Sequence, residues 1–371
     1  MPSARVQSVL QRFESVKVLE LRSPPPVASP AEARGDEPGF PLVETARDDA
    51  LAALERGETH YTDVAGIAPL REGVAAMLAT LGVSAASDAV VITAGEQEAR
   101  FLAIHVFAQL DWEVLLPQIV HPGVRKTTGL ARTRAHAYPV DPVTMEPDLA
   151  ALRRALAGGR RALYVESPHR LTGRSLPRRQ VEAIAEEAQR ADAVVIWDAA
   201  LAPWTFGTEY RYLAAIDGMA ERTLILGRLW PATGVEGWHI GYLAGPPAWM
   251  ARVRSLKQGI AICTCAPAQW GALGALRSRP WVPQEVRNLL LERRTQAARL
   301  LDGYVLPGDT ASVLAVRLPD RVEAGQAPGS PARGEEFGAP GVVRYTVTPA
   351  TAVIEAASAL ARVLSASGGK P

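Results

Sequence analysis

Short apolar runs alternate with amphipathic stretches through the middle of the chain. In three intervening stretches, Gln97–Leu110, Asp148–Ala157 and Arg178–Ala191, apolar residues recur three to four positions apart, as in helices. The strand-like runs are Ala89–Thr93, Glu113–Pro117, Arg134–Pro139, Ala162–Glu166, Ala193–Asp198, Thr223–Gly227 and His239–Ala244. This alternation predicts an α/β fold with a mostly parallel central sheet covered by helices on both faces. Ligands bind at the C-terminal ends of the strands in such a sheet.

The flanking regions follow a different pattern. Two strand-like runs, Ser312–Leu318 and Val342–Val347, enclose the Gly- and Pro-rich stretch Glu323–Pro340, for which we expect local disorder. Further helices are predicted at Thr45–Arg56, Leu70–Leu81, Trp249–Arg277, Glu285–Leu301 and Ala350–Leu364. We divide the chain into an N-terminal segment 1–55 that contributes to a small α+β domain, a large domain 56–280 and a C-terminal small domain 281–371.

Composition narrows the classes of function. The 371 residues are 48% hydrophobic and carry a formal net charge of +1, which gives no broad field to attract nucleic acid or an anionic membrane. No apolar stretch reaches the roughly 18–20 residues that span a bilayer, and the N-terminus lacks an apolar signal region. Cys263 and Cys265 are poorly spaced for a disulfide or a zinc site. We expect a cytoplasmic protein without a metal, acting on a small molecule.

Seven segments, in order along the chain, carry a family resemblance. They are HYTDVAGIAPLREGVA (60–75), ITAGEQEARFLA (92–103), WEVLLPQIVHPG (112–123), ESPHRLTG (166–173), VVIWDAAL (194–201), GWHIGYLAG (237–245) and VVRYTV (342–347). Together they resemble the fold-type-I pyridoxal-phosphate aminotransferases of class I/II. The resemblance implies that family's large and small domains and a homodimer, because each active site of the family borrows residues from the partner subunit.

Four features match positions that bind cofactor or substrate in that family. Asp198 matches the aspartate that pairs with the pyridinium nitrogen of the cofactor, and Arg344 matches the arginine that binds the substrate α-carboxylate with a planar fork. Gly95, Glu96 and Gln97 open a helix at the turn that holds the cofactor phosphate. Tyr61 matches a tyrosine that reaches the phosphate in the neighbouring subunit.

Other positions depart from the family pattern. The Schiff-base lysine of the family lies six residues before the glycine of Gly237–Trp238, where this chain has Pro231, and proline has no amine to condense with an aldehyde. Arg228 stands in the same altered loop. Further replacements are His239 for the phosphate arginine, Arg170 for the asparagine that bonds the ring hydroxyl, His121 for the stacking aromatic ring, and Leu201 for the tyrosine three residues after the aspartate.

The altered pocket therefore gathers imidazoles, arginines and Asp198. We expect Asp198 to orient a histidine, His239 or His169, as a general base, while Arg170 or Arg344 holds an anionic substrate. Arg228 and His121 are further candidates for substrate binding. This set favours a cofactor-independent enzyme that carries out hydrolysis, cyclisation, elimination or condensation on a small anionic or amino-acid-derived substrate, with specialised metabolism as a candidate setting.

Two alternatives stay open. The first is a non-catalytic binding or scaffold subunit on the same fold. The second is an atypical aminotransferase that uses another lysine, with Lys126 as the candidate, or that holds pyridoxal or pyridoxamine phosphate non-covalently.

Overall fold

A computed structural model describes residues 40–206, 210–229, 232–278 and 282–367. A seven-stranded sheet forms the centre of the large part of the molecule, with the strand order β1-β7-β6-β5-β4-β2-β3. Its strands are β1 (Val90–Ala94), β2 (Glu113–Pro117), β3 (Ala135–Tyr138), β4 (Arg161–Glu166), β5 (Val194–Asp198), β6 (Thr223–Arg228) and β7 (Ile240–Ala244). The five strands from β3 to β6 in this order pair in parallel, and only β7 pairs antiparallel, with β1 and β6. The predicted mostly parallel sheet is confirmed.

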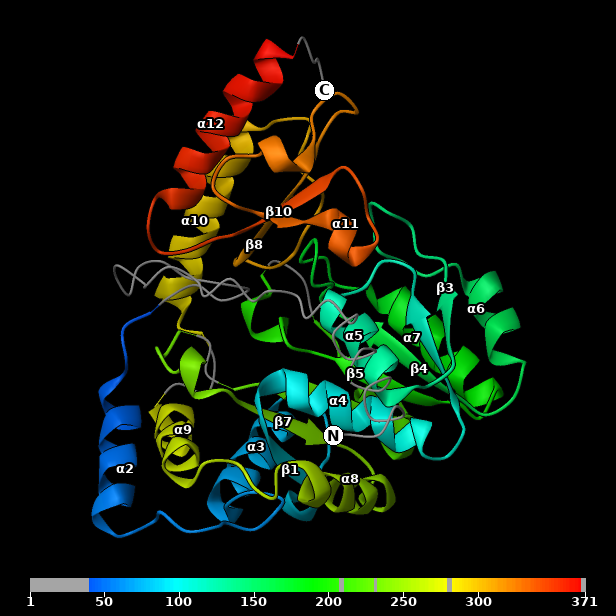
Figure 1. Cartoon of the computed structure of the whole chain (residues 1–371), viewed down its shortest axis with the longest axis vertical. Coiled ribbons are helices and arrows are strands. Elements are labelled where there is room, and N and C mark those ends of the chain that lie inside the picture. The colour runs from blue at the N-terminus through cyan, green and yellow to red at the C-terminus, as the bar shows by residue number, and fades with distance from the viewer. Residues whose placement is uncertain (1–39, 207–209, 230–231, 279–281, 368–371) are drawn as a thin grey trace, which may run out of the picture.

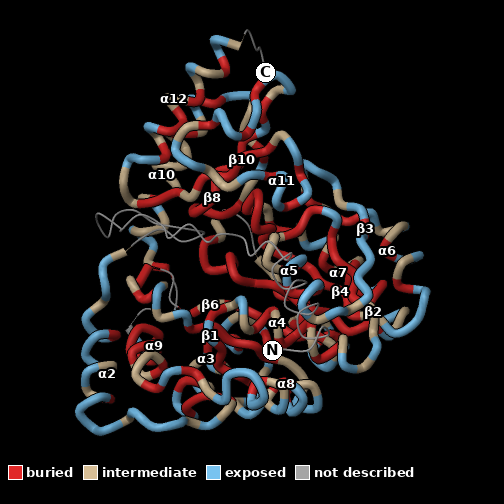
Figure 2. Tube along the Cα trace, in the orientation of Figure 1, coloured by how far each residue is buried: buried red, intermediate tan, exposed pale blue. Residues whose placement is uncertain are grey.

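Most strands of this sheet are buried (Figure 2), and their alternate residues belong to two hydrophobic clusters, one on each face. One face packs on α3 (Ala68–Thr80), α6 (Leu149–Leu156), α7 (Arg178–Arg190) and α9 (Ala266–Ser278). The other packs on α4 (Gly95–Ala108) and α8 (Pro247–Ile260). Burial on both sides explains why the inner strands are largely apolar in the sequence, whereas the edge strand β3 has three exposed residues.

A second sheet of three strands lies above the first in Figure 1. In it β10 (Val342–Thr346) pairs antiparallel with β8 (Val313–Arg317) and β9 (Ala332–Arg333). Helices α10 (Gln284–Leu300) and α12 (Ala352–Ala366) share a hydrophobic core with this sheet. The expected disorder at 323–340 is wrong, because that stretch forms β9 and α11 (Gly334–Phe337), and Phe337 is buried.

The single helix expected at Trp249–Arg277 is also wrong. The chain leaves α8 after Ile260 and enters α9 at Ala266, with Ile262 at a positive φ of 58°. The break brings the Thr264 hydroxyl to donate to the carbonyl of Ile92 on β1, 3.2 Å away. The interruption thus ties the helical layer to the edge of the sheet.

The N-terminal part of the described chain lies against the large sheet's helices. Helix α2 (Glu44–Glu55) packs along α9, at the lower left of Figure 1. Most of the segment 1–55 is outside the described residues, so our division into domains stays a prediction. Within the described ranges, no helix is long and apolar enough to cross a membrane.

Candidate active site

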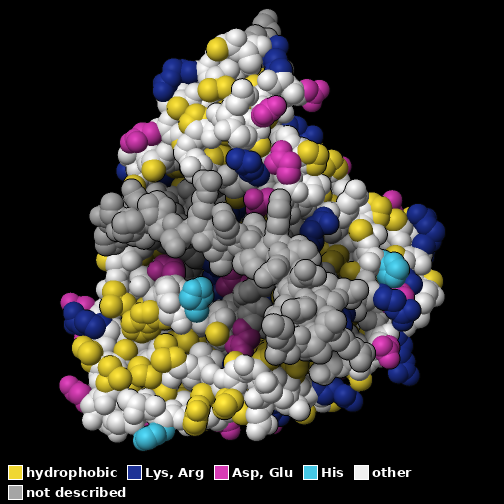
Figure 3. All heavy atoms as spheres, in the orientation of Figure 1, with side chains coloured by type: hydrophobic (Ala, Val, Ile, Leu, Met, Phe, Trp, Pro, Cys, Tyr) yellow, Lys and Arg dark blue, Asp and Glu magenta, His cyan; other side chains and the backbone are white. Residues whose placement is uncertain are grey.

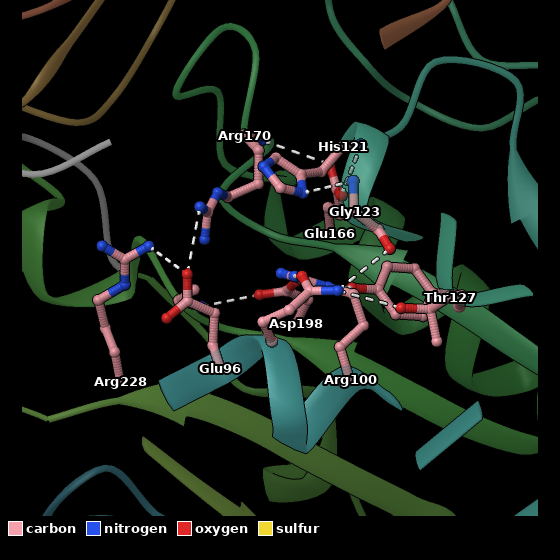
Figure 4. Close-up of polar contacts among 12 residues, drawn as sticks. Glu96, Arg100, His121, Gly123, Thr127, Glu166, Arg170, Asp198 and Arg228 are labelled. Atoms are coloured by element: carbon pink, nitrogen blue, oxygen red, sulfur yellow. Dashed lines mark hydrogen bonds and ion pairs between the residues drawn. The ribbon is translucent and has the colours of Figure 1, made fainter. Parts of the chain in front are cut away.

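Charged side chains converge at the C-terminal edge of the parallel strands (Figure 4). Glu166 ends β4 and Asp198 ends β5, and the two residues are direct partners in the register of these strands. The first turn of α4 and the end of β6, at Arg228, border the same place. This is where a parallel α/β sheet positions ligand-binding groups, because several strand ends and helix N-termini meet there.

Asp198 is held by groups on two other elements. Its Oδ2 accepts hydrogen bonds from Nη2 of Arg100 at 2.8 Å and from the hydroxyl of Tyr164 at 2.6 Å, and its Oδ1 accepts from the amide of Ala200 at 3.0 Å. Burial alone would raise the pKa of Asp198, but the charges of Arg100 and Arg170 outweigh it and lower that pKa. The expectation that Asp198 orients a histidine is therefore not what the structure shows, since its cationic partner is Arg100.

Glu96 brings two of the candidate arginines together. Its Oε1 lies 2.7 Å from Nη2 of Arg228 and 3.5 Å from Nη2 of Arg170. The arginine side chains are 10% and 2% exposed, so both guanidinium groups are largely shielded from water. The first turn of α4 thus presents a carboxylate to a pair of cations, at the helix end that itself favours an anion.

Glu166 is a second buried carboxyl in the cluster. Its Oε1 accepts from the amide of His121 at 2.9 Å, and its Oε2 accepts from the amide of Arg170 at 3.4 Å. Burial, and then the charge of Asp198, raise the pKa of Glu166 to about 7. A carboxyl in this state holds or releases a proton near neutral pH, which is characteristic of functional sites.

The candidate histidines differ in their surroundings. Both ring nitrogens of His169 are engaged by backbone, Nε2 with the carbonyl of Ile119 at 3.1 Å and Nδ1 with the amide of Leu171 at 3.2 Å. Burial lowers the pKa of His169 to about 4. His169 is thus a neutral side chain that orders its loop, and it is poorly suited to act as a general base.

His121 and His239 lie at the ends of helices near the cluster. Nδ1 of His121 caps α5 (Pro122–Ala131) by accepting from the amide of Gly123 at 3.1 Å. His239 is exposed and has a positive φ of 49°. Its ring faces Gly95, where an added Cβ would lie 3.4 Å from Nδ1 of His239. His239 therefore sits beside the first turn of α4, where the family resemblance placed it.

The remaining candidates are spread more widely. Arg344 is buried at the centre of the small sheet, opposite Ala315 on β8. Tyr61 is 81% exposed in the loop before α3. Gln97 donates to the hydroxyl of Thr127 at 3.1 Å and so joins α4 to α5. Pro231 lies outside the described residues.

Our reading of the sequence missed Arg100, Tyr164 and Glu166 as parts of this site. Arg100 had a detectable signal, because it lies on the apolar face of its helix, three and four residues before Ala103 and Ile104. Glu166 closes an apolar strand run, which is a costly place for a carboxylate without partners. Nothing in the local pattern around Tyr164 distinguishes it from a core residue.

This combination of fold and strand-edge cluster defines an aminotransferase-type α/β protein. A model of the family "Aminotransferase class I and II" matches residues 32–360, and the chain belongs to that family. It is similar to the probable N-succinyldiaminopimelate aminotransferase DapC of Mycobacterium tuberculosis, with 33% identity over 268 residues, or 71% of this chain and 67% of that protein. It is also similar to arginine–pyruvate transaminase AruH of Pseudomonas aeruginosa, with 29% identity over 324 residues, 79% of this chain and 80% of the relative.

Solved structures agree on the fold. N-succinyldiaminopimelate aminotransferase from M. tuberculosis superposes with a TM-score of 0.79 and 28% identity, covering 89% of this chain and 92% of that one. Aspartate aminotransferase from Thermus thermophilus with maleate gives a TM-score of 0.81 over 98% of this chain and 97% of the other, at 23% identity.

These findings correct two expectations from the sequence. The relatives are named as aminotransferases, and the family is the one whose cofactor is pyridoxal phosphate. The cofactor-independent acid–base enzyme and the absence of a cofactor are therefore wrong, and the findings also do not support the alternative of a scaffold subunit. The departures at single positions misled us because they were weighed more heavily than membership of the family.

The described residues suit the polar groups of this cofactor in part. Its phosphate needs cations or amides, which the first turn of α4, Arg228 and Arg170 supply, and its ring nitrogen needs a polar partner, which Asp198 supplies. Both places already have a partner of opposite charge in the chain, Glu96 beside the two arginines and Arg100 beside Asp198. The residues thus fit the cofactor on one condition, that its phosphate takes the place of the Glu96 carboxylate as the anionic partner of the two arginines.

Proposed function

We propose that the protein binds pyridoxal or pyridoxamine phosphate without a covalent bond and takes part in amino-group transfer on small amino and oxo acids. The observation that carries this proposal is the convergence of Asp198, Arg228 and Arg170 at the strand edge beside α4. Family membership supports the reaction class, and names such as arginine–pyruvate transaminase support the class of substrate.

Each group has a distinct task in this proposal. Arg228 and Arg170 hold the phosphate, together with the amides at the start of α4, and Asp198 faces the ring nitrogen. Arg344 binds the substrate carboxylate, for which its planar guanidinium offers two parallel hydrogen bonds. When bound, the cofactor supplies an electron sink for bonds at the amino-bearing carbon. Glu166, with its pKa near 7, holds a proton beside the site.

We further propose that the chain is a divergent member that lacks the Schiff-base lysine. The whole sequence contains four lysines, and Pro231 stands where the family has that residue. Nζ of Lys257 is buried and lies 2.9 Å from both carboxylate oxygens of Glu98, while Lys126 is exposed on α5. Lys257 is therefore committed to an ion pair.

We also propose a homodimer in the cytoplasm. Tyr61 is 81% exposed, as expected for a side chain that reaches a partner subunit. An apolar groove of about 470 Å³ lies between α2 and α9, lined by residues that include Leu51, Leu54 and Trp238. Figure 3 shows hydrophobic side chains gathered over this region. Burying such a surface in a two-fold interface would stabilise the dimer.

The proposal is tested by titrating the purified chain with pyridoxamine phosphate in a calorimeter. We expect saturable binding, and we expect a 2-oxo acid added to the loaded protein to give the corresponding amino acid in a mass spectrum. Arg228→Met should weaken binding about tenfold or more, equivalent to about 1.4 kcal/mol. Arg153→Met is the matched control, since Arg153 pairs with Glu187 on α7, outside the site. Absence of binding at millimolar concentration would overturn the proposal.

A further inference from the structure

Glu166 joins two loops that border the strand-edge cluster. Its side chain is fully buried. Oε1 accepts a hydrogen bond from the amide of His121 at the start of α5, 2.9 Å away, and Oε2 accepts from the amide of Arg170 at 3.4 Å. Nε2 of His169 lies 3.5 Å from Oε2, but this nitrogen is engaged by the carbonyl of Ile119. Backbone groups of both loops therefore meet at one buried carboxyl.

The neighbours of Glu166 divide into charged and uncharged groups. Its charged neighbours are Asp198, Arg100 and Arg170. The other titratable residues around it are His121, His169, Tyr138 and Tyr164. Burial lowers the pKa of His169 to about 4 and raises the pKa of both tyrosines, so these three side chains carry no charge near neutral pH. Burial and Asp198 favour the protonated carboxyl of Glu166, and the two arginines favour the ionised one.

The two arginines differ in what else they contact. Nη2 of Arg100 donates to Oδ2 of Asp198 at 2.8 Å, in an ion pair whose two side chains are each 1% exposed. Arg170 instead directs its Nη2 toward Glu96 on the first turn of α4, 3.5 Å away. The proposed function places the ligand phosphate there. A phosphate at this place adds negative charge beside one of the two cations that favour the ionised form of Glu166.

We infer that Glu166 takes up a proton from the solvent when a phosphate monoester binds at Arg170 and Arg228. This inference rests on the proposed function and deepens it, because Glu166 becomes a positioning residue that acts on the ligand through Arg170. A phosphate monoester carries about −1.5 to −2 charges at neutral pH, against −1 for the Glu96 carboxylate that it displaces. A proton on a carboxylate oxygen of Glu166 offsets the added charge and breaks no bond of the ligand.

The sign of the pH dependence follows from this uptake. Well below pH 7 the carboxyl of Glu166 is protonated before the ligand arrives, so binding needs no further proton. Above pH 7 the carboxyl is ionised in the free protein, and binding draws a proton from the solvent. By linkage, the affinity for the phosphate ligand then falls as pH rises.

The test is calorimetric titration with pyridoxamine phosphate in two buffers, neither of them phosphate, that differ in their enthalpy of ionisation. At pH 7.5 the wild type should take up about half a proton more per chain than Glu166→Gln, and from pH 6 to pH 9 its affinity should fall about tenfold more. The comparison removes protons that the ligand itself exchanges. Glu187→Gln is the matched control, because Glu187 is a largely buried carboxyl that pairs with Arg153 away from the site, and it should match the wild type.

The outcomes separate this inference from the proposed function. Equal proton uptake by the wild type and Glu166→Gln would overturn the role of Glu166 and leave the proposed function standing. Absence of binding by the wild type at millimolar concentration would overturn both. Infrared difference spectra of the wild type at pH 8 should gain a protonated-carboxyl band when the ligand is added. Absence of that band from a protein that binds the ligand would also overturn the inference, even where Glu166→Gln does not fold.

Discussion

Replacing Glu166 with glutamine should stabilise the protein above pH 7. The carboxyl is buried beside Asp198, which raises its pKa from 4.5 to about 7. The ionised form is thus disfavoured in the folded state relative to the unfolded state. At 1.36 kcal/mol for each pH unit of difference, the penalty at pH 8 reaches about 3 kcal/mol.

The sign of this effect depends on pH in a defined way. Below pH 4.5 the carboxyl is protonated in both the folded and the unfolded state. In that range the difference in free energy of unfolding between wild type and Glu166→Gln should be small and should not change with pH. As pH rises from 4.5 through about 7, the wild type loses stability and the variant does not. The amide oxygen of glutamine can still accept from the backbone of His121, so that contact is kept.

Urea unfolding at a series of pH values measures the difference in free energy of unfolding. Glu187→Gln is a control of opposite sign, because hydrogen bonds from Arg153 lower the pKa of Glu187. That variant should be less stable than wild type at pH 7, and the loss should vanish as pH falls below the ordinary range of glutamate. A Glu166→Gln variant that is no more stable at pH 8 than at pH 5, relative to wild type, would refute the reasoning.

Three further predictions follow from the charged cluster and the surface. Glu96→Gln should raise the affinity for pyridoxamine phosphate about tenfold in calorimetry, since the two arginines lose their internal anion; unchanged or weaker binding would show that Glu96 does not compete. Asp198→Asn should lower the free energy of unfolding by about 3–5 kcal/mol, because it leaves the charge of Arg100 buried without its anion. Urea unfolding of the double variant Asp198→Asn with Arg100→Leu should recover most of this loss. A double variant that is no more stable than Asp198→Asn alone would contradict the coupling. Light scattering should find a dimer for the wild type and a monomer for the double variant Leu51→Asp with Leu54→Asp. A wild-type monomer at micromolar concentration would contradict both the homodimer and an active site shared between subunits.

The periodic pattern was sufficient to predict the fold of the large sheet. The runs ending at Pro117, Glu166 and Asp198 end as strands at those same residues, because buried parallel strands are short runs of mostly apolar residues. The antiparallel β7 was also accessible from the sequence. The connection from β6 to β7 is too short to hold a crossover helix, which a parallel pairing requires.

The site was only partly predictable, because its partners come from distant parts of the chain. The ends of strands and the family resemblance placed Asp198 correctly at the strand edge. Its ion pair with Arg100 joins residues 98 positions apart, and Arg228 meets Glu96 across 132 positions. No local pattern specifies which buried cation meets which anion, so we assigned a histidine to Asp198 where the folded chain provides an arginine.

The central claim is that the chain holds its cofactor without a covalent bond. It is tested most directly by adding borohydride to the protein saturated with pyridoxal phosphate and recording both native and denaturing mass spectra. The account predicts one cofactor per chain in the native spectrum and none in the denaturing spectrum. A stoichiometric pyridoxyl adduct on a single lysine peptide would contradict it, and so would a native spectrum without bound cofactor.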